Sequence, residues 1–273
     1  KIKRIFSVSK KIYHLTPLPI SLKIKIAESI FNSDQSLREF SLSFNSVYTL
    51  DNKEKLEKQG NELNNQDNKN KIYEEILVPE PYKRVLIVEH RIPTPDKTSG
   101  SLRLLSVLKI LAKQGWDITF VSDNYPENYH WVLDNLKDEL LEYEKNLLRY
   151  VKKIIYGDND LLHHLVEEGK TYKLAILSYP EIMHKYSPYV RFHMTNCELI
   201  YDTVDIHFIR YLRQYSCEKS NEILQKSKSY KQMEIANFEI ADSILAITEN
   251  EKKEIIKYVP KKKVGIMPNI HIC

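Results

Sequence analysis

Short apolar runs recur along the chain from Lys83 onward and are separated by longer stretches of mixed character. Seven such runs cover residues 84–89, 117–122, 152–156, 172–178, 199–202, 243–248 and 264–267. Runs of this length that are rich in Ile, Val and Leu are typical of strands buried on both faces, as in a parallel sheet. We therefore predict a parallel sheet of about seven strands.

The segments between the runs show helical spacing. After the first run, Leu102, Leu105, Leu108 and Leu111 repeat every three residues, and Gly115 stands where a helix C-cap is expected. Further amphipathic stretches cover residues 131–151 and about 218–241. Strands that alternate with helices of this length predict an α/β, doubly wound, Rossmann-like domain with right-handed crossovers.

The chain divides into three parts by composition. Residues 1–50 form a basic segment, which we expect to be a helical extension, and residues 51–80 read as a polar linker before a domain over 81–273. The extension is expected to pack on the domain as a hairpin broken at Pro17 and Pro19, with its lysines in water. Peripheral contact with an anionic membrane surface is the alternative.

The overall composition is that of a soluble globular protein. Hydrophobic residues make up 42% and charged residues 29% of the chain, and the net charge of +4 gives no support for bulk nucleic-acid binding. The three cysteines are too far apart in sequence for a CxxC site, and no apolar run approaches the length of a membrane span. We therefore expect a cytoplasmic protein, with contact at the inner face of the membrane through the basic segment as an option.

The six glycines restrict the functions that the domain can have. The closest two are twelve residues apart, so neither GxGxxG nor a Walker loop is present. This weakens a reading as an NAD-dependent, S-adenosylmethionine-dependent or ATP-hydrolysing enzyme.

Ligands of such sheets bind beyond the carboxyl ends of the strands, near the switch in strand order. Polar side chains gather at these positions: Glu89, His90, Arg91, Asp123, Asn124, Tyr179, Glu181, Asp202, Thr203, Asp205, His207, Thr248, Glu249, Asn269 and His271. Most of the chemistry is therefore expected along one edge of the sheet.

The turn after the first strand, KTSGSLR, contains Ser99, Gly100, Ser101 and Arg103. Free N–H groups at the start of the following helix can accept a phosphate or a sugar hydroxyl, with help from the helix dipole and from Arg103. An ordinary helix start, with Ser99 or Ser101 as its N-cap, explains the same residues.

The segment YDTVDIHFIRYLR places Asp202, Asp205 and His207 at the end of a buried strand. Carboxylates beside an imidazole raise its pKa and orient it toward a hydroxyl, which suits recognition of sugar hydroxyls or general-base work. An Asp–Arg pair that anchors a helix is the alternative, and a metal site is the less favoured reading. The adjacent His163 and His164 are expected in solvent.

Taken together, four blocks resemble, in order, the amino-terminal half of family-4 glycosyltransferases, which are retaining enzymes of GT-B fold. The blocks are VLIVEHRIPTPDKTSGSLRLLSVLKILAKQGWDITFVSDN, YDTVDIHFIRYLRQ, MEIANFEIADSILAITENEKKEI and VGIMPNIH, within residues 83–271. The similarity is to bacterial surface-polysaccharide members in particular.

The resemblance implies roles at matching positions. Ser99, Gly100 and Ser101 would lie near the donor diphosphate, where the usual glycine pair is here Ser99-Gly100. Asp202, Asp205 and His207 would face the acceptor and the donor sugar, with Asp205 and His207 as the catalytic pair. Glu249 and Asn269 would contact substrate at the start of a helix and at the crossover into the second domain.

The expected activity is that of a retaining glycosyltransferase of the hexosyltransferase type. It would move a sugar from a nucleotide-sugar donor to a glycan, lipid-linked or protein acceptor, with no metal or other cofactor. The resemblance also implies a carboxyl-terminal GT-B domain that binds most of the donor, so the fragment alone is expected to be inactive. A non-catalytic Rossmann-like interaction module or membrane-docking subunit is the alternative.

Overall fold

A computed structural model describes residues 19–31, 83–125 and 137–270 of the chain. The linker predicted for residues 51–80 and most of the basic extension lie outside this part. Within the extension, helix α2 (Ile20–Phe31) begins directly after Pro19 and lies against helix α6 (Gly157–Glu168) of the main domain.

The main domain contains one sheet of seven strands in which every neighbouring pair is parallel. The strands are β1 (Arg84–Glu89), β2 (Asp117–Ser122), β3 (Lys153–Tyr156), β4 (Leu174–Ser178), β5 (Glu198–Asp202), β6 (Ser243–Ala246) and β7 (Lys263–Ile266). Their order is β3-β2-β1-β4-β5-β6-β7. The predicted parallel, Rossmann-like sheet is confirmed, and its switch in strand order lies between β1 and β4.

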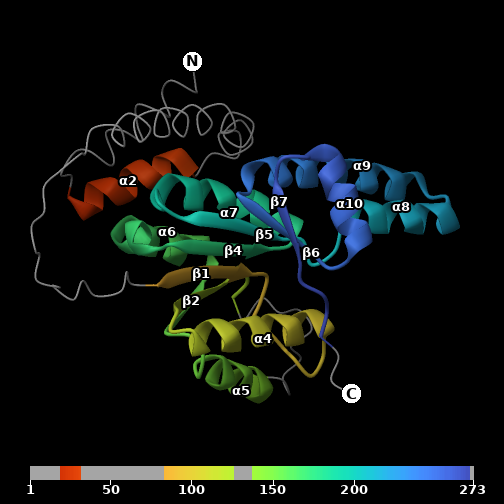
Figure 1. The fold of residues 1–273 in the computed structure, drawn as a ribbon. Coiled ribbons are helices and arrows are strands. Elements are labelled where there is room, and N and C mark those ends of the chain that lie inside the picture. Colours follow the sequence, from red (N-terminus) through yellow and green to blue (C-terminus); the bar gives the residue numbers. More distant parts are fainter. Residues whose placement is uncertain (1–18, 32–82, 126–136, 271–273) are drawn as a thin grey trace, which may run out of the picture.

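Helices cover both faces of the sheet (Figure 1). One face carries α4 (Ser99–Lys113) and α5 (Lys137–Leu147), and the other carries α6 and α7 (Pro180–His193), followed by α8 (His207–Glu218), α9 (Asn221–Ile240) and α10 (Glu249–Tyr258). A short 3-10 helix, η3 (Gly169–Thr171), precedes β4. The domain is therefore a three-layer α/β sandwich, as the alternation of patterns predicted.

Helix α4 ends as its sequence predicts. Gly115 has a φ of +78°, and its N–H donates to the carbonyl of Ala112, while the N–H of Trp116 donates to the carbonyl of Leu111. These two bonds satisfy carbonyls that the last helical turn leaves open. The glycine accordingly directs the chain from α4 into β2.

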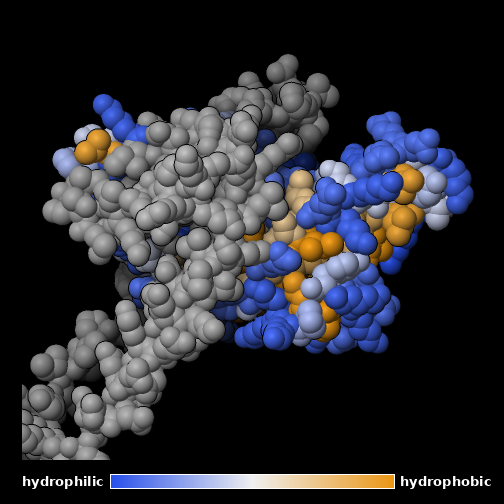
Figure 2. All heavy atoms as spheres, turned by 90° about the horizontal axis from the view of Figure 1, so that it is seen from above, coloured by the Kyte–Doolittle hydropathy of each residue, from blue (hydrophilic) through white to orange (hydrophobic). Residues whose placement is uncertain are grey.

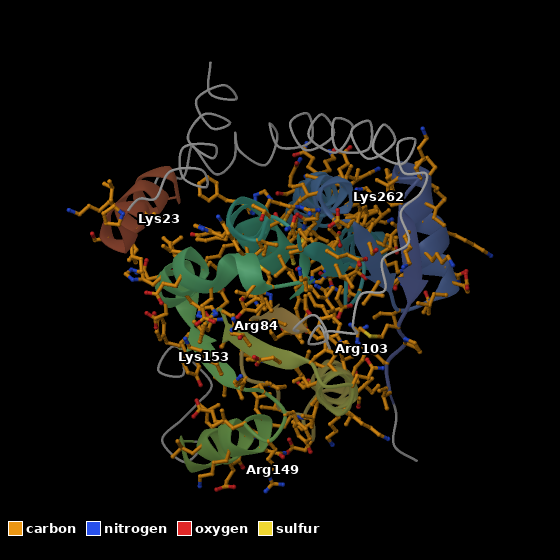
Figure 3. The ribbon with its side chains drawn as sticks, turned by 60° about the vertical axis from the view of Figure 1, so that its left-hand side comes forward. Lys23, Arg84, Arg103, Arg149, Lys153 and Lys262 are labelled. Carbon is orange, nitrogen blue, oxygen red and sulfur yellow. The ribbon has the colours of Figure 1, made fainter. Side chains whose placement is uncertain are left out.

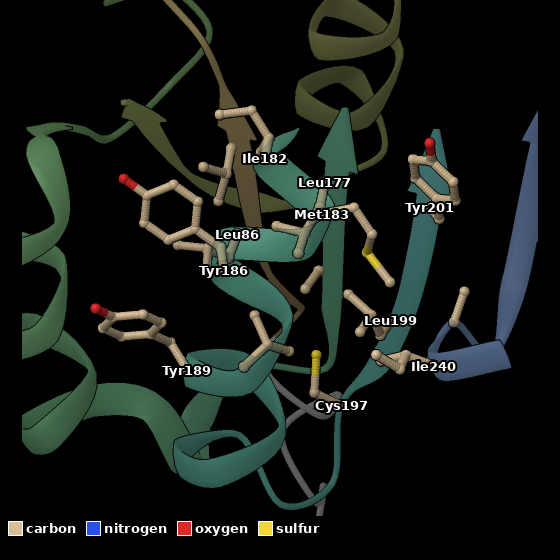
Figure 4. Packing of buried hydrophobic residues seen from close by; sticks show 14 of the residues in the cluster. Leu86, Leu177, Ile182, Met183, Tyr186, Tyr189, Cys197, Leu199, Tyr201 and Ile240 are labelled. Atoms are coloured by element: carbon tan, nitrogen blue, oxygen red, sulfur yellow. The ribbon is translucent and has the colours of Figure 1, made fainter. Parts of the chain in front are cut away.

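The larger core lies between the sheet and α7. Figure 4 shows α7 across the strands, with Ile182 and Tyr186 packed near Leu86 of β1 and Leu177 of β4. All four side chains are fully or almost fully buried. Burying an apolar side chain of this size contributes about 1.5–3 kcal/mol, so this contact fixes α7 and the turn that precedes it.

The prediction that His163 and His164 both lie in solvent was half wrong. His163 is exposed, but His164 is buried, and its Nε2 lies 2.6 Å from the hydroxyl of Tyr172. Burial lowers the pKa of His164 to about 4, so the ring is neutral at pH 7. The His164 ring belongs to a polar network with Tyr172 and Arg84, at the start of β1. Figure 3 shows Arg84 well apart from Arg103 in α4.

The described part of the face seen from above is mostly polar (Figure 2). Seen from above, hydrophilic residues predominate on α8 and α9, and a smaller group of hydrophobic residues adjoins the grey atoms (Figure 2). Among residues 19–31, 83–125 and 137–270, none of the helices combines the length and apolar character needed to cross a membrane.

Candidate functional site

Most of the polar residues predicted after the strands lie at the carboxyl edge of the sheet, whereas His271 lies outside the described residues. The N–H of Tyr179, just after β4, donates to the carbonyl of Asp202 at the end of β5, and the N–H of Asp123, after β2, donates to Glu89 at the end of β1. These bonds extend the strand pairing into the loops. The loops at the switch between β1 and β4 are therefore held in a fixed arrangement.

Helix α4 starts at this edge, but neither Ser99 nor Ser101 is its N-cap. Thr98 has extended backbone angles, and its hydroxyl oxygen accepts the N–H of Ser101 at 3.2 Å. The hydroxyl of Thr98 also donates to that of Ser101. Ser99 is exposed at the first helical position, so the predicted contact of residues 99–101 with a ligand stays a prediction.

Gly100 lies beside two residues with unusual backbones. A Cβ atom on Gly100 would lie 3.5 Å from the hydroxyl of Tyr179 and 3.9 Å from Cγ1 of Val204. Tyr179 has a φ of 73° and Val204 a φ of 59°, which is costly for residues other than glycine and most of all for β-branched ones. Backbone strain of this kind gathers at functional sites, and here it surrounds the start of α4.

Arg103 and Asp202 form an ion pair beneath this edge. Nη2 of Arg103 donates to Oδ2 of Asp202, and its Nη1 donates to the carbonyl of Met267 at 2.8 Å. Burial raises the pKa of Asp202 and Arg103 lowers it, with burial the stronger effect. Because the two side chains face each other and are buried, this pair anchors α4 to the end of β5.

Glu89 ends β1 next to this pair and is almost as deeply buried. Its Oε1 accepts the N–H of His90 at 3.0 Å. Burial raises the pKa of Glu89 to about 8, so the carboxyl is mostly protonated at pH 7 and can donate a hydrogen bond.

Asp205 and His207 are brought together as predicted. Nδ1 of His207 lies 2.9 Å from Oδ1 of Asp205, and Nη1 of Arg210 donates to Oδ2 of the same carboxylate at 2.8 Å. Burial lowers the pKa of His207, but Asp205 raises it more strongly, so the net shift is upward. Burial raises the pKa of Asp205, but His207 and Arg210 together lower it more strongly. The net shift is downward, so the Asp205 carboxyl stays ionised.

Two tyrosine rings enclose the imidazole of His207. The Tyr230 ring from α9 stacks on it at 5.4 Å between centroids, and the Tyr179 ring meets it edge-on at 6.1 Å. The hydroxyl of Tyr230 donates to Glu181 in the first turn of α7, and Nε2 of His90 lies 3.8 Å from the same carboxylate. Burial raises the pKa of Glu181, but His90 and Tyr230 more than offset it and hold that pKa at about 2.

Helix α8 has its N-terminal cap from another helix. The carboxylate of Glu234, in α9, accepts the N–H of His207 at 3.0 Å and that of Phe208 at 2.8 Å. The N-cap residue Ile206 has no side chain that could do this. Burial raises the pKa of Glu234 to about 7, and the two N–H groups partly counter this effect. Glu234 thus fixes the position at which His207 enters the site.

The remaining predicted residues lie further along the edge. Glu249 is exposed at the start of α10, and Thr248 is the N-cap of this helix, since its hydroxyl oxygen accepts the N–H of Glu251. Asn269 follows β7, and its buried Oδ1 has no hydrogen-bond partner among the described residues. The bond from Arg103 to Met267 links this segment to α4, so Asn269 follows a segment that is tied to the site.

Sequence reasoning noted Tyr179 and Glu181 as polar residues but missed Tyr230 and Glu234. Both of the missed residues lie in α9, more than twenty positions after His207, so no local spacing connects them to it. The one available signal was an acidic residue on the otherwise apolar side of a helix, in EIANFEI. Within the described ranges, no three His, Cys, Asp or Glu residues converge as a metal site would require.

Comparison with protein-family models gave no match, and comparison with curated proteins gave none either. The sequence motifs and the geometry of the carboxyl edge therefore indicate the function.

Proposed function

We propose that the domain over residues 81–273 is the amino-terminal, acceptor-side domain of a retaining glycosyltransferase. It would serve transfer of a sugar from a nucleotide-sugar donor to a glycan, lipid-linked or protein acceptor. The observation that carries the proposal is the paired imidazole of His207, held by Asp205 and enclosed by two tyrosine rings at the carboxyl edge.

The chemistry of the edge suits a ligand that combines hydroxyls with phosphates. Carboxylates, phenols and imidazoles hydrogen-bond sugar hydroxyls, and aromatic rings pack against the apolar faces of sugars. The start of α4, where Gly100 leaves the backbone open, favours a phosphate through its N–H groups and helix dipole. The departing nucleoside diphosphate would be stabilised by the same dipole and by basic side chains.

The resemblance to family-4 enzymes implies which domain contacts the donor and which contacts the acceptor. In such enzymes a second domain makes most contacts with the nucleotide sugar, and the domain described here faces the acceptor. Transfer is therefore assayed with the whole gene product that contains this chain. Ligand binding is measured on that gene product and on this chain by itself.

The test combines a ligand screen with one substitution. Thermal unfolding of the gene product should shift upward with a nucleotide sugar and not with NAD or S-adenosylmethionine. The His207→Ala variant should lose most transfer activity, whereas the exposed His163→Ala control should retain it. Stabilisation by NAD or S-adenosylmethionine, or full transfer by His207→Ala, would contradict the proposal.

A further inference from the structure

The imidazole of His207 can act either as a base or as a hydrogen-bond donor, and its two nitrogens decide which. Nδ1 lies 2.9 Å from a carboxylate oxygen of Asp205 and 3.2 Å from the carbonyl oxygen of the same residue. Both partners are acceptors, so Nδ1 carries a hydrogen. Nε2 has no hydrogen-bond partner in the described part of the chain. The function of the ring therefore depends on whether Nε2 is also protonated.

The aromatic surroundings favour the charged ring. Tyr230 presents its face to the imidazole, at an interplanar angle of 23°. The face of a phenol ring carries negative charge density and attracts a cation. The hydroxyl of Tyr230 donates to the ionised carboxylate of Glu181, which places further negative charge behind the ring.

The charged groups around His207 come from every element that packs against it. Asp205 precedes α8 and Glu181 lies in α7, while Glu234 of α9, with its pKa of about 7, carries only part of a charge at pH 7. Arg210 of α8 is the permanent cation among these groups, and His90 lies 3.8 Å from Glu181. The guanidinium of Arg210 is half exposed and is itself bound to Asp205, which limits its repulsion of the imidazole. The balance of charge is negative, in agreement with the raised pKa of His207.

Tyr179 connects this imidazole to the start of α4. Its ring meets His207 edge-on, and its hydroxyl lies close to Gly100. A cationic imidazole and the N–H groups of a helix N-terminus thus flank the same tyrosine, and both favour an anion.

We propose that His207 works as a cationic hydrogen-bond donor, through Nε2–H, to a phosphoryl oxygen of the ligand, and that Tyr230 and Glu181 are positioning residues that keep it in this form. No proton is transferred in this role, and general-base work by His207 is excluded. The choice of a phosphoryl group rests on the proposed function, whereas the protonation state of the ring is independent of it.

The protonation state can be measured directly on the chain labelled with 15N-histidine, by NMR between pH 5 and 9, with His207→Gln for assignment. At pH 7 both nitrogens of His207 should carry hydrogen, while His164, with its pKa of about 4, serves as the neutral internal reference. Tyr230→Leu and Glu181→Gln should lower the titration midpoint of His207, and Tyr230→Phe should lower it less. Tyr215→Leu, in the same helix as His207 but without stacking on it, is the control. A neutral His207 at pH 7 overturns the proposal.

Binding of inorganic pyrophosphate, followed by calorimetry at pH 6 and pH 9, tests the ligand. Loss of one charge-assisted hydrogen bond should weaken binding about tenfold or more in His207→Gln at pH 6. The difference in pyrophosphate affinity between the wild type and His207→Gln should shrink at pH 9. Because the titration of pyrophosphate affects both proteins alike, the variant corrects for it. Equal affinities at pH 6 would overturn the proposal. A charged, pyrophosphate-binding His207 in a gene product that transfers no sugar would instead overturn the proposed function alone.

Discussion

Arg103 of α4 and Asp202 of β5 form an ion pair in which the two side chains are only 2% and 6% exposed. The pair joins a helix on one face of the sheet to a strand two positions from β1, the strand that precedes this helix. A buried carboxylate without its cation is far more costly than an exposed one, so each partner depends on the other. The start of α4 is thereby fixed relative to the end of β5, where Asp205 and His207 follow.

Removal of one partner should destabilise the domain strongly. Arg103→Met leaves Asp202 buried and unpaired, and the free energy of unfolding should fall by about 3 kcal/mol or more. Urea denaturation measures the change. The double variant Arg103→Met, Asp202→Leu should recover much of the loss, because no charge remains buried. Equal stability of the single and double variants would argue against a coupled pair.

Glu89 should make stability depend on pH in an unusual direction. Its pKa of about 8 in the folded chain lies above the ordinary value of 4.5, so between these pH values unfolding releases a proton. The contribution of Glu89 to stability is thus undiminished below pH 4.5 and declines as the pH rises to 8. Glu89→Gln should stabilise the domain by roughly 4 kcal/mol more at pH 8 than at pH 4.5. Denaturation curves at both pH values test this, and a gain that does not depend on pH would contradict it.

The effect of the strained backbone at Val204 on stability should be separable from the effect of Val204 on ligand binding beside Gly100. Val204→Gly removes the cost of a positive φ and should raise stability by about 1 kcal/mol. Lys219→Gly, at the positive φ that ends α8, is the matched control and should stabilise similarly. Only Val204→Gly should weaken pyrophosphate binding, because Val204 adjoins Gly100. A destabilised Val204→Gly variant would show that the conformation is not strained.

Two glycines should respond differently to alanine. A Cβ on Gly157 would lie 2.7 Å from the Tyr125 ring, and its φ of +71° disfavours any side chain, so Gly157→Ala should cost about 2 kcal/mol. Gly100→Ala meets only ordinary contacts and should change stability by less than about 1 kcal/mol. The added methyl group should nevertheless weaken phosphate binding at α4. Thermal unfolding and calorimetry distinguish the two effects, and unchanged binding in Gly100→Ala would remove the need for a bare backbone there.

The sequence by itself determined the sheet and the edge along which its polar residues lie. Runs of apolar residues marked all seven strands to within two residues at each end, and the pattern is clearest in central strands such as β1 and β2, which are buried on both faces. Gly115 marked a helix end through local hydrogen bonding alone. The proximity of Asp205 and His207 also followed from their spacing.

Only the tertiary structure decided what each edge residue faces. On sequence grounds Arg103 is expected to assist phosphate binding, whereas in the structure it is buried against Asp202, 99 positions away, and anchors α4 to β5. Likewise, Tyr230 and Glu234 reach His207 because α8 and α9 fold back on each other. The physical reason is range: hydrogen-bond caps and apolar periodicity act within a few residues, whereas burial, and with it the charge state of Glu89 and His207, depends on elements that meet only in the folded chain.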